Sequence, residues 1–145
     1  MTIVADTNVL ASGLAGFRTP TTTVAMILRL WRLGVFTLVT SEYILTELSH
    51  TLHSPYFRKR LSSQQVTTAM RLLRRKTTIT PLTTTVHGVA SHPEDDVILA
   101  TAVSAKADYL VTGDTKLQHI RTYNGVTILS PKQFLATLTD DLPNA

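Results

Sequence analysis

A chain of 145 residues suits one domain with its own core, and a hydrophobic fraction of 43% excludes a disordered protein. The absence of cysteine excludes disulfides, thiolate metal sites and cysteine nucleophiles, and no apolar run has the roughly 18–20 residues of a membrane-spanning helix. We therefore expect a cytoplasmic protein. Fourteen Lys and Arg against ten Asp and Glu give a net charge of +4, which suits a phosphate-bearing partner.

The first third of the chain alternates between patterns typical of strands and of helices. An apolar run that stops at Asp6 predicts a short buried strand, and the glycines that follow predict a loop. Apolar residues then recur at i, i+3, i+4 and i+7, which predicts an amphipathic helix. The predicted segments are a strand over 2–5, a loop through Gly13 and Gly16, a helix after Pro20 that ends near Gly34, a strand over 35–39, and a helix with Ser41 as its N-cap.

The middle of the chain is predicted to be a basic helical region. Pro55 breaks the chain, and Ser62 with Gln65 matches the capping box of a second helical segment. Half of the basic residues lie in this region: Arg58, Lys59, Arg60, Arg71, Arg74, Arg75 and Lys76. This helical pair is therefore expected to be the basic end of the molecule.

The last part of the chain returns to strands that alternate with helices. The predicted segments are a strand over 79–82, a loop over 83–91, a helix from about Asp95 to Lys106, strands over 109–112 and 126–129 with an Asn124-Gly125 turn before the second, and a helix capped by Ser130 to Gln133. This alternation indicates an α/β sandwich around a mostly parallel sheet. We expect a single domain over residues 1–139 and a frayed tail over residues 140–145.

Four acidic residues fall where a parallel sheet gathers its functional groups. Asp6 ends the first strand, Asp114 follows a later strand, Asp96 lies in the first turn of a helix, and Glu47 lies at the core edge of another. Close carboxylates repel one another and favour a counter-ion, and all-oxygen ligands select Mg²⁺ or Mn²⁺. Taken singly, each acid is better explained as a cap, a turn residue or a solvated side chain than as a site residue. Only their combined spacing indicates a site.

Asp95 competes with Asp96 for one place in this site, because neighbours on a helix point about 100° apart. We expect Asp96 to face the site, since it precedes Ile98 and Ala102 in the register that packs on the sheet. Asp95 is then expected on the outer face of the helix.

Four segments, in this order along the chain, resemble the PIN domain. The similarity spans residues 2–129, and the most similar subgroup is the bacterial and archaeal PIN proteins related to VapC-type toxins. The segments are Asp6-Thr7-Asn8-Val9-Leu10, Ser41 through Glu47-Leu48, Asp96-Val97-Ile98-Leu99-Ala100-Thr101-Ala102, and Leu110-Val111-Thr112-Gly113-Asp114.

The resemblance implies a PIN-like three-layer α/β/α sandwich, an acidic pocket that binds one or two Mg²⁺ or Mn²⁺ ions, and endonuclease activity on RNA that leaves 5′-phosphate and 3′-hydroxyl ends. It also implies a cognate antitoxin protein and a homodimer or higher homo-oligomer. It assigns Asp6, Glu47, Asp96 and Asp114 as the catalytic and metal-binding acids, with Thr7, Asn8 and Thr112 as polar support. The seven basic residues of the middle region become candidates for RNA-backbone contacts, with a solvated helix surface as the alternative.

Two other functions remain open from the sequence. The chain is compatible with a catalytically weak PIN module that binds RNA or a protein partner, which a cleavage assay would separate from a nuclease. Asp6 at the end of the first strand is also compatible with a phosphoryl-transfer or phospho-receiver domain. That hypothesis leaves Glu47 and Asp114 without a role.

Overall fold

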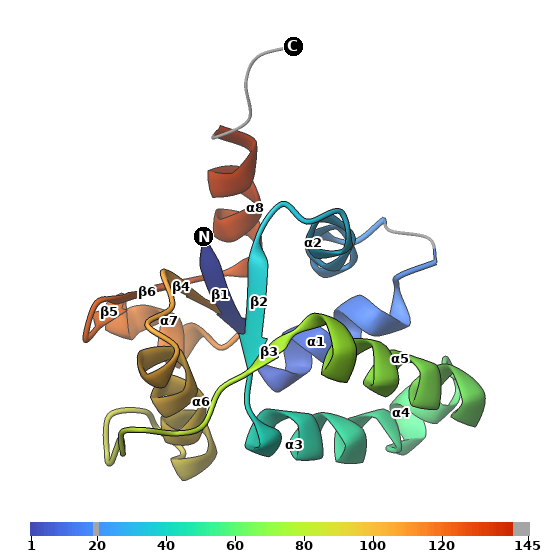
Figure 1. Cartoon of the computed structure of the whole chain (residues 1–145), viewed down its shortest axis with the longest axis horizontal. Helices are drawn as coiled ribbons and strands as arrows, with labels where there is room; N and C mark the ends of the chain where they lie inside the picture. The colour runs from blue at the N-terminus through green and yellow to red at the C-terminus, as the bar shows by residue number, and fades with distance from the viewer. Residues whose placement is uncertain (19–20, 141–145) are drawn as a thin grey trace.

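One six-stranded sheet, in the order β3-β2-β1-β4-β6-β5, forms the centre of the protein (Figure 1). The computed structural model describes residues 1–18 and 21–140, so the predicted fraying of residues 141–145 lies outside the described residues, while Asp140 still belongs to the last helix. Neighbouring strands are parallel except for β5, which pairs with β6 in the antiparallel direction. The strands are β1 (Thr2–Ala5), β2 (Thr37–Thr40), β3 (Thr78–Ile79), β4 (Tyr109–Val111), β5 (Thr122–Tyr123) and β6 (Val126–Leu129).

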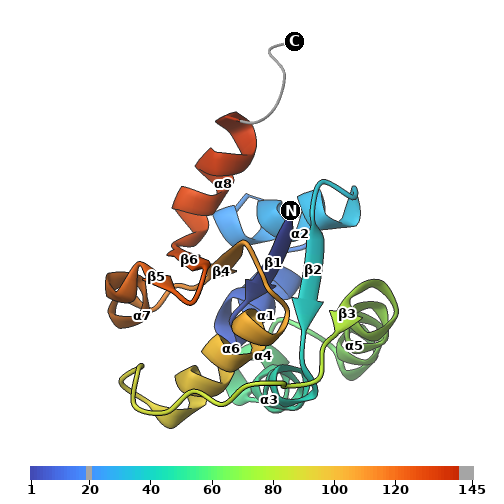
Figure 2. The same cartoon turned by 60° about the vertical axis from the view of Figure 1, so that its left-hand side comes forward.

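Helices cover both faces of this sheet, which confirms the predicted α/β/α sandwich. Helix α6 packs against β1 and β4 on one face, while α8 packs against β6 and α2 on the other (Figure 2). No helix among the described residues is long and apolar enough to cross a membrane. The helices are α1 (Thr7–Ala15), α2 (Thr23–Arg32), α3 (Glu42–Leu52), α4 (Pro55–Arg58), α5 (Ser63–Lys76), α6 (Pro93–Ser104), α7 (Thr115–Ile120) and α8 (Pro131–Asp140).

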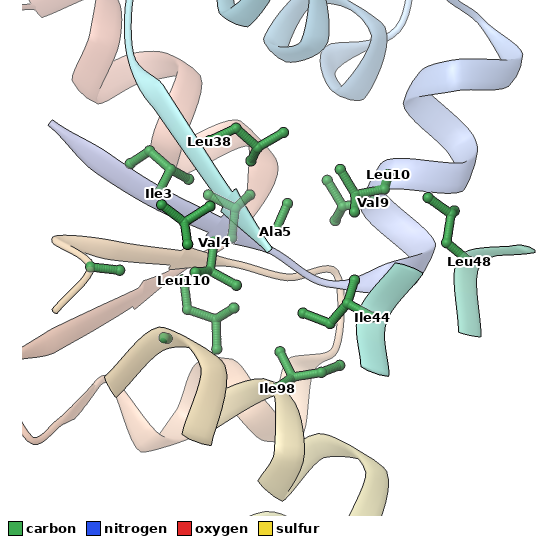
Figure 3. Close-up of a cluster of buried hydrophobic side chains, with 14 of the residues drawn as sticks. Ile3, Val4, Ala5, Val9, Leu10, Leu38, Ile44, Leu48, Ile98 and Leu110 are labelled. Carbon is green, nitrogen blue, oxygen red and sulfur yellow. The ribbon is translucent and has the colours of Figure 1, made fainter. Parts of the chain in front are cut away.

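Strand β1 lies at the centre of the core. Its residues Ile3 and Val4 are buried, as expected of a parallel strand covered by helices on both faces. Figure 3 shows these side chains beside Leu110 of β4, with Ile98 of α6 and Ile44 of α3 closing the cluster. The apolar run that predicted the first strand is therefore the strand around which the layers pack.

Most predicted elements are present, with small shifts of their ends. The amphipathic helix after Pro20 is α2, whose Trp31 is buried, and the capping boxes predicted at Ser62 and at Ser130 are both formed. The strand predicted over 35–39 spans Thr37–Thr40 instead, and the one predicted over 79–82 is β3, Thr78–Ile79. These shifts are of the size at which assignments of element ends commonly differ.

The loop predicted after Asp6 is wrong, because these residues form helix α1. The Asp6 carboxylate caps this helix by accepting the Val9 N–H at 2.9 Å. Gly13 lies inside the helix, and a Cβ there would meet Leu28 Cδ1 at 2.7 Å and the Val24 carbonyl oxygen at 3.0 Å. The glycine therefore marks a close approach of α1 to α2 and not a turn.

Three short elements were not predicted from the sequence. Pro55 does not simply break the chain, because it opens the one-turn helix α4 at a position where its missing N–H is not needed. Helix α7 begins directly after Asp114, and strand β5 forms a hairpin with β6 through the predicted Asn124-Gly125 turn.

Replacing Gly13 by Ala is expected to lower the free energy of unfolding by about 1 kcal/mol. Alanine gains about 1 kcal/mol of helix propensity over glycine, but overpacking a buried contact costs about 1–3 kcal/mol. Urea unfolding of Gly13→Ala in the wild type and in Leu28→Ala measures both effects. The Leu28→Ala background removes the closest contact but leaves the Val24 carbonyl oxygen at 3.0 Å, so Gly13→Ala should be less destabilising there than in the wild type. Stabilisation in the wild type would contradict the close approach.

Candidate active site

A pocket of about 490 Å³ opens at the carboxyl ends of β1 and β4. Parallel strands bring the residues that follow them to the same edge of a sheet, which is where ligands bind in open α/β folds. The pocket is lined by Asp6, Thr7, Asn8, Val9, Ser12, Val24, Glu47, Thr51, Asp95, Ile98, Gly113, Asp114 and Pro131. Three of the four acids proposed from the sequence therefore lie around it, and the fourth does not.

Asp6 is the most enclosed acid of the pocket, with 7% of its surface exposed. One carboxylate oxygen accepts the Val9 N–H, and the other accepts the Thr112 hydroxyl. Burial raises the pKa of Asp6, the two hydrogen bonds partly oppose this shift, and the nearby Asp114 charge adds to it. The charged form of Asp6 is therefore less stable than that of a solvated aspartate.

Thr112 connects Asp6 to Asp114. Its hydroxyl oxygen accepts the backbone N–H of Asp114 at 3.1 Å while it donates to Asp6. Asp114 in turn caps helix α7, because its Oδ1 accepts the N–H groups of Lys116 at 2.8 Å and Leu117 at 3.3 Å. This threonine holds both acids in place.

Glu47 enters the pocket from helix α3. Its Oε2 accepts the Thr7 hydroxyl at 3.0 Å, which ties α3 to the first turn of α1. Asn8, the next residue of α1, is exposed and lines the pocket. The three polar residues assigned by resemblance thus lie in or beside the acidic site.

The structure reverses the expected positions of Asp95 and Asp96. Asp96 is buried and does not line the pocket, because its carboxylate accepts three backbone N–H groups of the preceding loop: Gly88 at 3.0 Å, Val89 at 3.2 Å and Ala90 at 2.8 Å. Asp95 lines the pocket instead. The expectation that Asp96 faces the pocket is therefore wrong.

The spacing of apolar residues on α6 could not separate these two acids. Asp95 lies three residues before Ile98 and Asp96 lies three residues before Leu99, and Ile98 and Leu99 are both buried. Both acids are therefore in register with buried residues, and the loop N–H groups determine which of them is held away from the pocket.

Neighbouring negative charges raise the pKa values of two aspartates around the pocket, Asp6 and Asp95. Burial raises the pKa of Asp95, and the charges of Asp114, Asp6 and Glu94 raise it further against a smaller opposing effect of His92. Such mutual repulsion is what a bound cation would relieve. Among the described residues, the Arg74–Glu42 pair is the one salt bridge, so no Lys or Arg balances these acids.

The acids are spread around the pocket and do not converge on a single point. In residues 1–18 and 21–140, no three carboxylates or imidazoles lie close enough together to hold an ion as they stand. The chemistry of the set fits a hard divalent cation, because all the charged ligands are carboxylates and they lack a cationic partner. Asp6, Glu47, Asp95 and Asp114 are the residues that would hold it.

The seven basic residues of the middle region lie on α4, α5 and the segment between them, outside the acidic pocket. All are exposed, Arg74 pairs with Glu42 at 2.9 Å, and the Arg60 guanidinium stacks 3.6 Å from the centre of the Tyr56 ring. Arg60 also lines a second pocket of about 640 Å³ with an apolar floor that includes Leu28 and Trp31. The basic surface and the acidic site are therefore separate features.

A family model of the PIN domain matches residues 2–116. The chain belongs to the PIN domain family. No curated protein gives a significant match. Among solved structures, this PIN domain is similar to the crystal structure of VapBC2 from Rickettsia felis bound to a DNA fragment from their promoter, with a TM-score of 0.61, 17% identity, and coverage of 90% of this chain and 98% of that chain. At this identity the likeness shows the fold.

Replacing Asp96 by Ala should lower the free energy of unfolding by about 2 kcal/mol, because three loop N–H groups lose a charged acceptor. Asp95→Ala, the matched control, should not destabilise the protein. Hydrogen exchange at residues 88–90 should become faster in Asp96→Ala alone. Equal losses in both variants would contradict the different positions of the two acids.

Asp95→Asn is expected to stabilise the protein in EDTA at neutral pH. Because the pKa of Asp95 is raised in the folded state, folded protein binds this proton more tightly than unfolded chain, and stability falls as pH rises through that pKa. The variant lacks this loss, so its gain in Tm should shrink as pH is lowered. Mg²⁺ should raise the Tm of the wild type more than that of the variant. A lower Tm for Asp95→Asn in EDTA would refute this account.

Proposed function

We propose that this PIN domain is an endoribonuclease dependent on Mg²⁺ or Mn²⁺, and that it acts as the toxin of a toxin–antitoxin pair. The observation that carries the proposal is the cluster of Asp6, Glu47, Asp95 and Asp114 around one pocket with no balancing Lys or Arg among the described residues. Asp95 takes the role that the sequence analysis assigned to Asp96. Family membership supports the proposal.

The proposed reaction is hydrolysis of an RNA phosphodiester bond. When bound, Mg²⁺ would lower the pKa of a water molecule and offset negative charge on the phosphate. The water oxygen bonds to phosphorus as the bond to the 3′-oxygen breaks, which leaves 5′-phosphate and 3′-hydroxyl ends. A pocket carboxylate that does not hold the cation would take the proton that the water loses, and the departing 3′-oxygen would take up a proton from solvent.

The remaining pocket residues would act by positioning. Thr112 holds Asp6 and Asp114 in a fixed relation, and Thr7 orients Glu47. Asn8 is exposed beside these acids, where its amide can donate to a phosphate oxygen. Substitution of such supporting groups commonly lowers metal affinity or activity by about 10- to 100-fold.

The basic surface of α4 and α5 is proposed to hold the RNA backbone at a distance from the reacting phosphate. Arg71 and Arg75 are exposed on α5, whereas Arg74 is engaged by Glu42. Contacts of this kind weaken steeply with salt. A long RNA could contact the basic surface and the acidic pocket at the same time.

The proposed antitoxin has a suitable docking place in the second pocket. Its apolar floor, which includes Leu28 and Trp31, is bordered by Arg18 and Arg60, so it fits an amphipathic segment that also carries acidic residues. An arginine of that partner, inserted among the carboxylates of the acidic pocket, would block the site by charge pairing. VapBC2 from Rickettsia felis has a fold similar to that of this chain.

The test is cleavage of a mixed RNA pool with Mg²⁺ or Mn²⁺. Asp6→Asn, Asp95→Asn and Asp114→Asn should lower activity by more than the roughly 10- to 100-fold loss expected for Thr112→Val. Asp140→Asn, an exposed acid at the end of α8, is the matched control and should cleave normally. EDTA should abolish cleavage in the wild type.

Two results would count against a metal-dependent nuclease. Cleavage that persists in excess EDTA, or that leaves 2′,3′-cyclic phosphates, would exclude the proposed chemistry. No cleavage with any RNA or metal, in folded wild-type protein, would favour the catalytically weak PIN module that binds RNA or a partner.

A further inference from the structure

The acidic pocket continues beyond its carboxylates into a region without charged side chains. We call this region the neutral arm, and it is formed by Asn8, Ser12, Val24, Thr51 and Pro131. These residues come from four helices, α1, α2, α3 and α8. The lining of the pocket thus includes uncharged polar and apolar side chains as well as carboxylates.

Helix α3 changes from charged to uncharged along the pocket. On α3, Glu47 is followed one turn later by Thr51, whereas on α1 the uncharged Asn8 is followed one turn later by Ser12, six residues after the Asp6 cap. Both helices begin at the carboxyl edge of the sheet, run away from it and pack against each other (Figure 1). Ser12 and Thr51 therefore lie farther along these helices from the carboxyl edge than Asp6 and Glu47, whereas Pro131 lies two residues after β6 at that edge.

The arm has both polar and apolar surfaces open to a ligand. Asn8 and Ser12 are exposed, Thr51 is half-buried, and all three line the pocket, so an amide and two hydroxyl groups are available to a ligand there. Val24 and Pro131, from the first turns of α2 and α8, add apolar surface. This combination suits a sugar and a heterocyclic base, which have apolar faces and hydrogen-bonding edges.

The pocket is also larger than the volume that a cation and a phosphate group beside the acids would occupy. A volume of about 490 Å³ lies within the range of roughly 300–1,000 Å³ typical of pockets for small organic molecules. A hydrated cation and one phosphate group would leave much of this space unfilled. The remaining space is available to the rest of a nucleotide.

We propose that the neutral arm binds the nucleoside next to the reacting phosphate, and that the Ser12 and Thr51 hydroxyls select its base. This inference rests on the proposed function, because it takes a phosphate beside the acids as its starting point. The arm carries no charge that would repel the phosphate or hold it away from the acids. A hydroxyl both donates and accepts, so selection would come from the fixed positions of Ser12 and Thr51 relative to the polar groups of each base.

Binding of small nucleotides tests this inference without cleavage. The folded protein, with Mg²⁺, is titrated by calorimetry with the four nucleoside 5′-monophosphates and with ribose 5-phosphate, which lacks a base. We expect at least one nucleotide to bind about tenfold more tightly than ribose 5-phosphate. Ser12→Ala and Thr51→Val should each change the preference among the bases by about three- to tenfold, the value of one hydrogen bond.

A bulky substitution provides a second variant. Ser12→Phe, at an exposed position, should fill the arm and reduce nucleotide affinity to that of ribose 5-phosphate, while Mg²⁺ binding persists. Thr67→Val on α5, outside both pockets, is the matched hydroxyl control and should bind like the wild type. Ribose 5-phosphate binding as tightly as every nucleotide would overturn the proposal.

The arm and the nuclease can fail separately. If the wild type binds nucleotides as expected but cleaves no RNA, the neutral arm stands and the proposed nuclease does not. If the wild type cleaves RNA with the same sequence preference and nucleotide affinity as Ser12→Phe and Thr51→Val, the nuclease stands and the arm is refuted.

Discussion

At the end of the central strand the chain buries a carboxylate, and the arrangement of the pocket depends on how that group is accommodated. The pairing of Ala5 with Val111 sets Asp6 beside Thr112, and the Asp6 N–H continues the ladder by donating to the Val111 carbonyl at 3.0 Å. A buried polar group is tolerated only with partners, and Asp6 obtains them from β4 and from the first turn of α1. A change in the register of β1 and β4 would therefore misplace both Asp6 and Asp114.

The acids that crowd the pocket also begin its helices. Asp6 caps α1, Asp114 caps α7, and Asp95 lies in the first turn of α6. The N-terminus of a helix carries partial positive charge, so these helices offset part of the repulsion between the carboxylates. Burial and the neighbouring charges still raise the pKa values of Asp6 and Asp95. The partial positive charge of the helix N-termini reduces the repulsion between the carboxylates but does not neutralise their negative charge. Such a site favours the binding of a divalent cation.

The sequence predicted the features that depend on local chemistry and missed those that depend on packing between segments. The buried strand over 2–5 and the cap at Ser62 follow from residue type and spacing, and both are present. Gly13 was interpreted as part of a loop because its role is set by Leu28 of another helix. Asp96 was chosen over Asp95 because it precedes Ile98 and Ala102 in the expected register, whereas its position is set by three N–H groups of a loop whose path is a tertiary property. The order of the strands predicts that the acids lie near one edge of the sheet. It does not predict in which direction Asp95 and Asp96 point around the axis of α6.

A cluster of carboxylates and a nucleic-acid substrate repel each other, so the proposed function needs attraction from elsewhere. The chain as a whole carries a net charge of +4, and its basic residues concentrate on α4 and α5, outside the acidic pocket. Such a distribution attracts RNA over a distance comparable to the screening length of about 8 Å at physiological salt, while contact at the acids requires a bound cation. Uncharged groups of the acidic pocket, such as Ser12 and Thr51, neither attract nor repel the backbone. Under the proposed function, the basic surface would capture RNA, these groups would select a nucleotide, and the acids with a bound cation would carry the reaction.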